Sequence, residues 1–334
     1  MRSPTNNRVE VVAPEHALEP ERRGALLQSK LAALVRTHFG VDTTVPNPFP
    51  GGAARSANDA GWVLVESDAA RALGKAMAWA RQHGLRELHL FVDDDAGVLA
   101  RRASLFKDPP IVWWLNGTEL HATDPEPLLP APPIVDNIEL RELLERAGLE
   151  VVREREHIAG ELRGLEVARV VHDHLEVGVG AADRELTAML HGDLPPSDAL
   201  ERVVAIVDEH RRPEARPHPL NQLVPERWLR WTLRNDPSRV GVTSLEPAPA
   251  TRARVGLRER DIACAVADDA VVVCSVGVDL DLVPAAAEAR LALAPDARLL
   301  LAVPERDDHP ATRALAKRLK HPAEVVAVSG DWRT

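Results

Sequence analysis

Two glutamates occupy similar places in neighbouring apolar segments of the chain. Glu166 lies in GLEVARVV and Glu176 in LEVGVG, and Asp183 stands near the start of the next predicted helix. Carboxylate oxygens are the ligands that Mg²⁺ and Mn²⁺ prefer, and a metal held by them activates water for hydrolysis. One hypothesis is therefore a metal-dependent catalytic site formed by Glu166, Glu176 and Asp183. The alternative places both glutamates on the solvated face of two strands whose other face is buried.

Residues 137–192 resemble the core of restriction-endonuclease-like nucleases of the PD-(D/E)XK type, in the order helix, three strands, helix. The resemblance implies that Glu166 stands at the family's first acid and Glu176 at the second. It also implies a bound Mg or Mn ion and phosphodiester cleavage. The chain departs from the family's pattern at Gly178, where the motif lysine belongs, and residues 108–316 contain no lysine. The implied protein is therefore a nuclease-like fold that has lost its chemistry.

The register of the hairpin decides whether the two glutamates can share a metal ion. A three-residue turn would pair Val171 with Leu175 and leave Glu166 and Glu176 on one face, four residues apart. At about 3.3 Å per residue, this separation is too large for one ion. Bringing the two carboxylates together would require a β-bulge.

Three further groups carry side chains that metals bind. The first is a pair of histidines on the predicted turn, followed after the next helix by His191 and Asp193, and imidazole suits zinc or manganese. The other two are acids at strand ends and a DxD pair in VGVDLDLVP. Each group also has a simpler interpretation, because turns collect polar residues and acids complement the dipole at a helix start. The candidate ligands are His172, His174, Asp93, Asp279 and Asp281.

The segment PERWLRWTLR is the best candidate for a contact surface. Trp228 and Trp231 are three residues apart and alternate with Arg227 and Arg230. Such an amphipathic helix could meet a protein partner or stack on bases. The alternative is that the tryptophans belong to a buried core, which is the commoner place for tryptophans at helical spacing, with the arginines as its solvated rim.

Strands that alternate with helices predict the fold class, which is α/β. GWVLVE, ELHLFVD and IVWWL in the N-terminal part, and VVVCSV, ARLLLAVPE and EVVAVSG in the C-terminal part, are separated by helices with apolar stripes. This alternation is typical of right-handed βαβαβ crossovers in a parallel sheet. The two units, residues 61–117 and 270–330, suggest an internal repeat, although any βαβαβ unit shares this rhythm. They flank a mixed central region with the nuclease-like topology.

Composition shifts predict the boundaries between these parts. Residues 45–61, rich in proline and glycine, are expected to form a loop within the first unit. The predicted parts are a flexible arm (1–24), an N-terminal α/β unit (25–122), a Pro-rich linker (123–136), a central α+β region (137–245) and a C-terminal α/β unit (260–334).

Charge and composition limit the possible partners and compartments. The formal net charge is −10, so any nucleic-acid site must depend on a local basic surface. The bias towards Ala, Arg and Pro over Lys is typical of a high-GC bacterial genome. The polar start argues against a secretion signal, and the lack of a long apolar run argues against a membrane span. The sequence therefore predicts a cytoplasmic protein. Cys264 and Cys274, on adjacent predicted strands, are expected to be free thiols.

Two functions follow as hypotheses. The first is a nucleic-acid-acting protein of nuclease-like fold, degenerate or inactive, which would be a metal-dependent nuclease or hydrolase only if it kept a metal site. The second is a non-catalytic protein that binds a partner or a small ligand between its two repeated α/β units. The first predicts a local basic surface, and the second an apolar cleft between the units.

Overall fold

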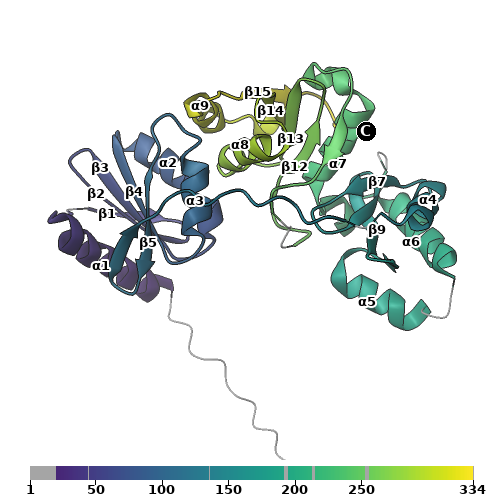
Figure 1. The fold of residues 1–334 in the computed structure, drawn as a ribbon, viewed down its shortest axis with the longest axis horizontal. Coiled ribbons are helices and arrows are strands. Elements are labelled where there is room, and N and C mark those ends of the chain that lie inside the picture. The colour runs from purple at the N-terminus through teal and green to yellow at the C-terminus, as the bar shows by residue number, and fades with distance from the viewer. Residues whose placement is uncertain are drawn as a thin grey trace, which may run out of the picture.

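The computed structural model describes residues 20–43, 45–134, 136–191, 195–212, 215–252 and 256–333. Three sheets and their helices form an arch, with the N-terminal unit at one foot, the central region at the other and the C-terminal unit between them (Figure 1). The predicted α/β class is confirmed, and two of the sheets contain parallel strands.

The N-terminal unit is a six-stranded sheet. Its strands, in sheet order, are β1 (Val45–Phe49), β2 (Gly52–Ala57), β3 (Ala60–Val65), β4 (Glu87–Val92), β5 (Ile111–Asn116) and β6 (Glu119–Ala122). Its helices are α1 (Pro20–Phe39), α2 (Leu73–Gln82) and α3 (Ala96–Ala103). Strands β3, β4 and β5 are parallel, with α2 and α3 as crossovers, whereas the other strands are antiparallel additions.

The predicted loop at residues 45–61 is instead the β1–β2 hairpin and the start of β3. Pro50 and Gly51 form its two-residue turn, in which Gly51 has φ +79°. Glycine adopts this conformation without a steric penalty, and proline favours the position before it. A turn signal was therefore mistaken for an irregular segment.

The C-terminal unit is a five-stranded sheet in the order β11 (Glu246–Ala248), β12 (Ala263–Val266), β13 (Ala270–Cys274), β14 (Arg298–Pro304) and β15 (Glu324–Val328). Its helices are α7 (Pro225–Asn235), α8 (Leu282–Leu293) and α9 (Pro310–Arg318). The first two strand pairings are antiparallel and the last two parallel. The same succession of one helix, two antiparallel pairings and two parallel pairings runs from α1 to β5. Cys264 and Cys274 are buried free thiols, as expected.

The two α/β units share one hydrophobic core. Helices α2 and α3 pack against α8 and α9, so that Leu73 and Leu99 belong to the same buried cluster as Val283 and Leu315. The approach is close at Gly74, where a Cβ atom would lie 1.9 Å from the carbonyl oxygen of Leu280. Only glycine fits there without displacing the backbone of the other unit.

A reciprocal pair of backbone hydrogen bonds also joins the units. The amide of Lys107 donates to Arg318 (2.9 Å), and the amide of Lys320 donates to Leu105 (2.9 Å). One segment follows α3 and the other follows α9, so equivalent places in the two units exchange equivalent bonds. At this contact the two units are therefore related as if by a local two-fold axis.

The central region is an antiparallel sheet of four strands, in the order β10 (His174–Val177), β9 (Leu165–Val171), β8 (Ile158–Leu162) and β7 (Glu150–Arg153). Around it lie α4 (Ile138–Arg146), α5 (Gly180–His191) and α6 (Pro196–His210). The sequence predicted only three strands, because IAGEL lacks a clear alternation of polar and apolar residues. Arg163 (φ +46°) and Gly164 (φ +74°) form the two-residue hairpin loop between β8 and β9. This turn is the sequence feature that could have revealed β8.

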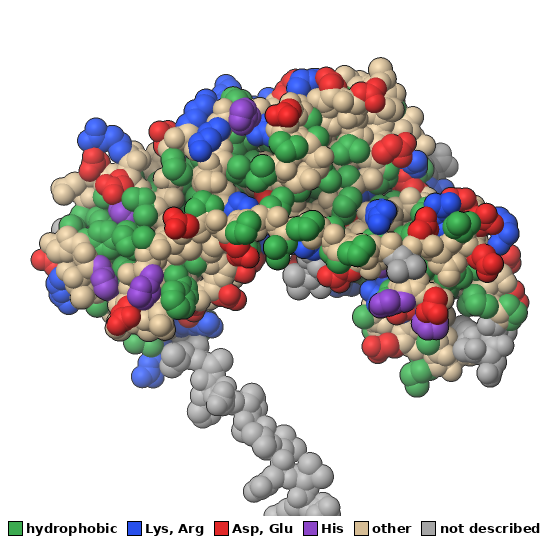
Figure 2. Space-filling model, in the orientation of Figure 1, with side chains coloured by type: hydrophobic (Ala, Val, Ile, Leu, Met, Phe, Trp, Pro, Cys, Tyr) green, Lys and Arg blue, Asp and Glu red, His purple; other side chains and the backbone are tan. Residues whose placement is uncertain are grey.

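Side chains of both charges are spread over the face drawn in Figure 2, and the underside of the arch is hollow between the N-terminal unit and α5. No continuous basic band crosses this face. Among the described residues, no helix has the length and apolar character needed to cross a membrane.

Candidate functional site

The central hairpin has a different register from the one that a three-residue turn would give. His174 pairs with Val171 across a two-residue turn, in which His172 adopts φ +58°. Glu176 therefore lies opposite Arg169 rather than opposite an apolar residue. The one-residue shift places a cation directly beside the carboxylate.

Glu166 and Glu176 meet at the guanidinium of Arg184, which comes from α5. Its Nη1 lies 3.2 Å from Glu166 Oε1 and its Nε lies 3.4 Å from Glu176 Oε2. Arg169 Nε also donates to Glu176 Oε2 (2.7 Å), and His157 Nε2 lies 3.1 Å from Glu166 Oε2. The two candidate acids thus converge, and the group between them is a cation supplied by the chain itself.

The electrostatics of Glu166 fit a fixed anion. Burial acts to raise the pKa of Glu166, but the hydrogen bond and charge of His157 and the charges of Arg227 and Arg184 together hold this pKa below its usual range. A carboxylate with a lowered pKa remains ionised at neutral pH and is poorly suited to donate a proton.

A third glutamate, Glu161 on β8, lies directly opposite Glu166 in the β8–β9 pairing. Its Oε1 accepts from Arg227 Nη1 (2.8 Å) and its Oε2 from Arg230 Nη2 (2.8 Å). Both arginines come from α7, and Glu161 and Arg230 are almost completely buried. The acids on the two adjacent strands are therefore each neutralised by arginine.

Two further positions of the predicted catalytic set have structural roles. Asp183 Oδ2 accepts from the backbone amide of Val179 (2.7 Å), which caps the start of α5. Gly178, at the position of the family's lysine, has φ +138°, and a Cβ atom there would lie 2.8 Å from the backbone nitrogen of Arg184. The local backbone leaves no space for a lysine at this position.

The histidine pair and Asp93 lie in different units of the fold. His172 and His174 lie on the exposed hairpin turn, where His174 Nε2 is 3.2 Å from Asp173 Oδ1. Asp93 is exposed at the end of β4, where its carbonyl accepts from Trp114 Nε1 (3.2 Å). Asp193 and the side chain of His191 lie outside the described residues.

The residues that would hold an Mg or Mn ion do not fit one. A metal needs carboxylates whose lone pairs are free, and Glu166 and Glu176 share arginines instead. In the part of the chain that the structure describes, no group of three or more His, Cys, Asp or Glu side chains is arranged to hold a metal.

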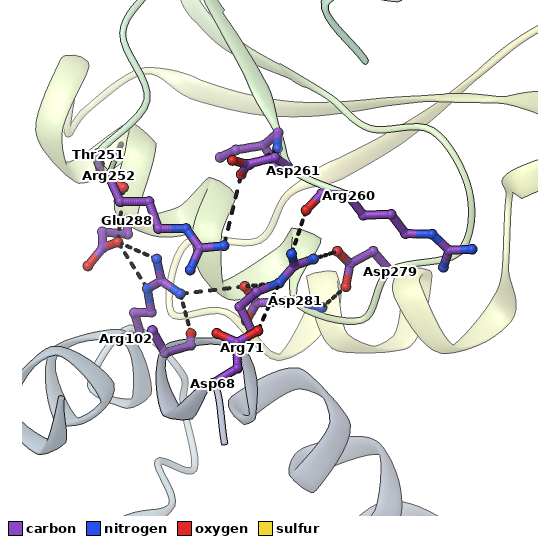
Figure 3. A network of polar contacts seen from close by, with 12 residues as sticks. Asp68, Arg71, Arg102, Thr251, Arg252, Arg260, Asp261, Asp279, Asp281 and Glu288 are labelled. Carbon is purple, nitrogen blue, oxygen red and sulfur yellow. Dashed lines mark hydrogen bonds and ion pairs between the residues drawn. The ribbon is translucent and has the colours of Figure 1, made fainter. Parts of the chain in front are cut away.

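The DxD pair lies in an ion-pair network between the two α/β units (Figure 3). Asp279 pairs with Arg71, which precedes α2. Asp281, which is 2% exposed, lies 3.5 Å from Arg102 Nη1. Arg102 in turn donates to Glu288 of α8 (2.9 and 2.8 Å). These charges lie beside the shared hydrophobic core at the contact between the units. The second hypothesis had predicted an apolar cleft there.

Helix α7 carries the predicted contact residues, and most of them are buried. Trp228 is 1% exposed and Arg230 is 2% exposed, whereas Trp231 is half-buried. Arg227 pairs with Glu154 as well as Glu161, at 2.8 Å each. The helix therefore joins the central sheet to the C-terminal unit, and Trp228, Arg227 and Arg230 are buried in that contact.

A pocket of about 600 Å³ lies between the central region and the C-terminal unit, above Arg227 and Arg230. Residues of β9 and the start of α5 line it, as do β11, β12 and the described residues Arg252, Leu257 and Asp261 that lie between these two strands in the sequence. Its ionic lining is Glu154, Arg155, Glu156, His157, Glu166, Arg169, Arg184, Arg227, Arg230, Arg252 and Asp261. Leu257, Ile262 and Val179 supply an apolar part of the wall.

Two of these arginines are the least neutralised. Arg155 Nη1 donates to the carbonyl of Thr251 (2.9 Å), and within the described residues no carboxylate pairs with Arg155. Arg252 Nη2 lies 4.0 Å from Asp261 Oδ1, the outer limit of an ion pair. Because Thr251 precedes Arg252, the two cations border the same side of the pocket.

Sequence reasoning missed the residues that define this pocket. Arg184 and Arg155 were not singled out, because their contacts with Glu166 and with Thr251 join residues that are distant in the sequence. The only early signal was the Arg163-Gly164 turn, which could have revealed β8 and with it Glu161.

Neither a family model, nor a curated protein sequence, nor a solved structure matches this chain.

Proposed function

We propose that the protein is a non-catalytic receptor for a small organic ligand that carries a phosphate group, bound in the pocket between the central region and the C-terminal unit. The single observation that carries this proposal is the pairing of the central carboxylates with arginine. It removes the acids from hydrolytic chemistry and leaves guanidinium groups along a pocket of ligand size.

The charges of the pocket favour a phosphate on one side. Most of its arginines are matched by Glu154, Glu161, Glu166 or Glu176, so they form a fixed scaffold. Arg155 is the clearest exception, and its planar guanidinium can bind two oxygens of one phosphate. The start of α5 borders the same pocket, and the positive end of the helix dipole favours an anion there, although Asp183 already accepts from the Val179 amide.

The size and the apolar wall favour a ligand with a ring system. Small-molecule sites commonly measure roughly 300 to 1,000 Å³, and this pocket measures about 600 Å³. Leu257, Ile262 and Val179 can contact the faces of a base while the phosphate meets the arginines. A nucleoside monophosphate has this combination of groups.

Isothermal titration calorimetry with the four ribonucleoside monophosphates tests the proposal. We expect at least one to bind, and we expect Arg155→Gln with Arg252→Gln to weaken its binding by about ten-fold or more, since each charge-assisted hydrogen bond contributes about 1.5 to 3 kcal/mol. The unphosphorylated nucleoside should bind much more weakly.

The matched control is Arg141→Gln on α4, a partly exposed arginine whose partners are Asp136 and Glu145. This variant should retain the affinity of the natural chain. The proposal fails if none of the four nucleotides binds at millimolar concentration, or if the double variant binds as tightly as the natural chain.

A nucleic-acid-binding protein of nuclease-like fold is a second candidate. Glu161 and Glu166 on adjacent strands β8 and β9 favour it, because they face one another as paired acids do in such nucleases. Their arginine partners make this candidate a binding protein without cleavage. It predicts oligonucleotide binding that weakens steeply with salt, whereas a mononucleotide receptor would not prefer the longer ligand.

The two α/β units are proposed to be an internal duplication. Support comes from their shared succession of helix, antiparallel pairings and parallel pairings, and from the reciprocal bonds of Lys107 and Lys320. The proposed receptor then uses two related units differently, because only the C-terminal unit contributes to the pocket.

A further inference from the structure

Arg211 is a buried cation whose hydrogen bonds to the described residues all go to backbone carbonyl groups. Its side chain is 0% exposed. Nε donates to the carbonyl of Arg163 (3.0 Å), and Nη1 donates to those of Leu220 (2.8 Å) and Leu223 (3.0 Å). The guanidinium also stacks on Trp228, with its carbon 4.5 Å from the ring centre.

Nη2 of Arg211 has no hydrogen-bond partner among the described residues. Burial lowers the pKa of Arg211 to about 9, and the nearby charges of Arg333 and Arg163 act in the same direction, against that of Glu161. A buried guanidinium that contacts carbonyl groups and a ring but no carboxylate is costly to ionise, so an anion on the far side of Trp228 would stabilise it.

A second pocket, of about 240 Å³, is lined by Trp228 and by Arg333. Arg333 is 6.0 Å from the ring centre of Trp228, so the indole contacts one guanidinium inside the protein and another at the pocket. Arg212 and His218 line the same pocket. The carboxylate in its lining, Asp331, accepts from the backbone amide of Arg333 (3.1 Å).

Further basic groups surround this pocket. His218 stacks on His210, with ring centres 3.9 Å apart. Burial and the charge of Arg306 lower the pKa of Arg333. The region therefore concentrates positive charge in a chain whose net charge is −10.

We infer that this pocket, formed by Arg212, His218, Trp228 and Arg333, is a second anion site that takes a single phosphate group. Guanidinium groups from two separate segments can bind its oxygens from different sides. The volume is below the roughly 300 Å³ at which organic-ligand sites begin, so the site suits inorganic phosphate or the phosphate end of a monoester. This site is separate from the larger pocket, with which it shares no lining residue.

Phosphate titrations at constant ionic strength, set with NaCl, test the inference. We expect inorganic phosphate to bind the natural chain, and we expect Arg212→Gln with Arg333→Gln to weaken binding by about ten-fold or more. Glycerol 2-phosphate, titrated in parallel, distinguishes a site for free phosphate from a site for a monoester. Because Arg212 is exposed and Arg333 is half-buried near the chain end, the double variant should fold.

The control is Arg141→Gln on α4, which lines neither pocket and should leave phosphate binding unchanged. Phosphate should also raise the urea midpoint of the natural chain more than that of the double variant. The inference is overturned if neither probe binds, or if the double variant binds both probes as tightly as the natural chain does.

Discussion

Replacing Glu161 with glutamine is expected to lower the free energy of unfolding by about 3 to 5 kcal/mol. The carboxylate is completely enclosed and accepts from Arg227 and Arg230 at 2.8 Å each. An amide group cannot accept from both arginines, because one of its two ends is itself a donor. The charge of Arg230 would then remain buried without its carboxylate, whereas Arg227 would retain Glu154.

Urea denaturation measures this loss. The matched control is Glu156→Gln, an exposed neighbour on the β7–β8 loop, for which we expect a change within about 0.5 kcal/mol. The double variant Glu161→Met with Arg230→Met removes both buried charges and should recover a large part of the loss. A small effect of Glu161→Gln alone would show that the buried cluster is not what joins the central sheet to α7.

Replacing Asp281 with asparagine is expected to stabilise the protein at alkaline pH. Burial raises the pKa of Asp281 to about 7 and Asp279 acts in the same direction, although Arg102, Arg252 and Arg71 oppose them. Its Oδ1 has no hydrogen-bond partner among the described residues. Ionising this side chain therefore costs free energy, and a neutral amide of similar shape avoids the cost.

The direction of this pH dependence follows from the raised pKa of Asp281. In the natural chain the contribution of Asp281 to stability is complete below its ordinary pKa of about 3.9 and is lost as the pH rises through the folded value. The variant should match the natural chain near pH 4 and exceed it by roughly 1 to 4 kcal/mol near pH 8. Denaturant titrations of both chains at the two pH values measure the difference. If Asp281→Asn stabilises the protein equally at both pH values, Asp281 is not the titrating group. The control is Asp296→Asn at an exposed position.

The strands and helices at the two ends of the chain were predictable because their patterns are local. Runs such as ELHLFV and AVVVC are central strands of mixed sheets, and nearly all of their residues are buried. Strands β1, β2 and β11 were missed because they contain proline, glycine and alanine instead of β-branched residues. Their pairing partners supply the stability that their own sequences do not.

The candidate site was less predictable because its character depends on pairs that are distant in sequence. Glu166 and Glu176 were recognisable as candidate metal ligands in the sequence. In the fold, both pair with Arg184 on the following helix and serve as its counter-charges. Glu161 and Arg230 are separated by 69 residues. No local pattern indicates that such groups meet, so the sequence could suggest a metal site where the fold builds an ion-pair cluster.

Titration of the protein with Mn²⁺, followed by the paramagnetic resonance signal of the free ion, tests the central claim that arginine occupies the place of a metal. Because Arg184 already holds both carboxylates, we expect no saturable Mn²⁺ uptake that depends on Glu166, and the natural chain and Glu166→Gln should give the same curve. Saturable uptake of Mn²⁺ by the natural chain that Glu166→Gln abolishes would contradict this claim.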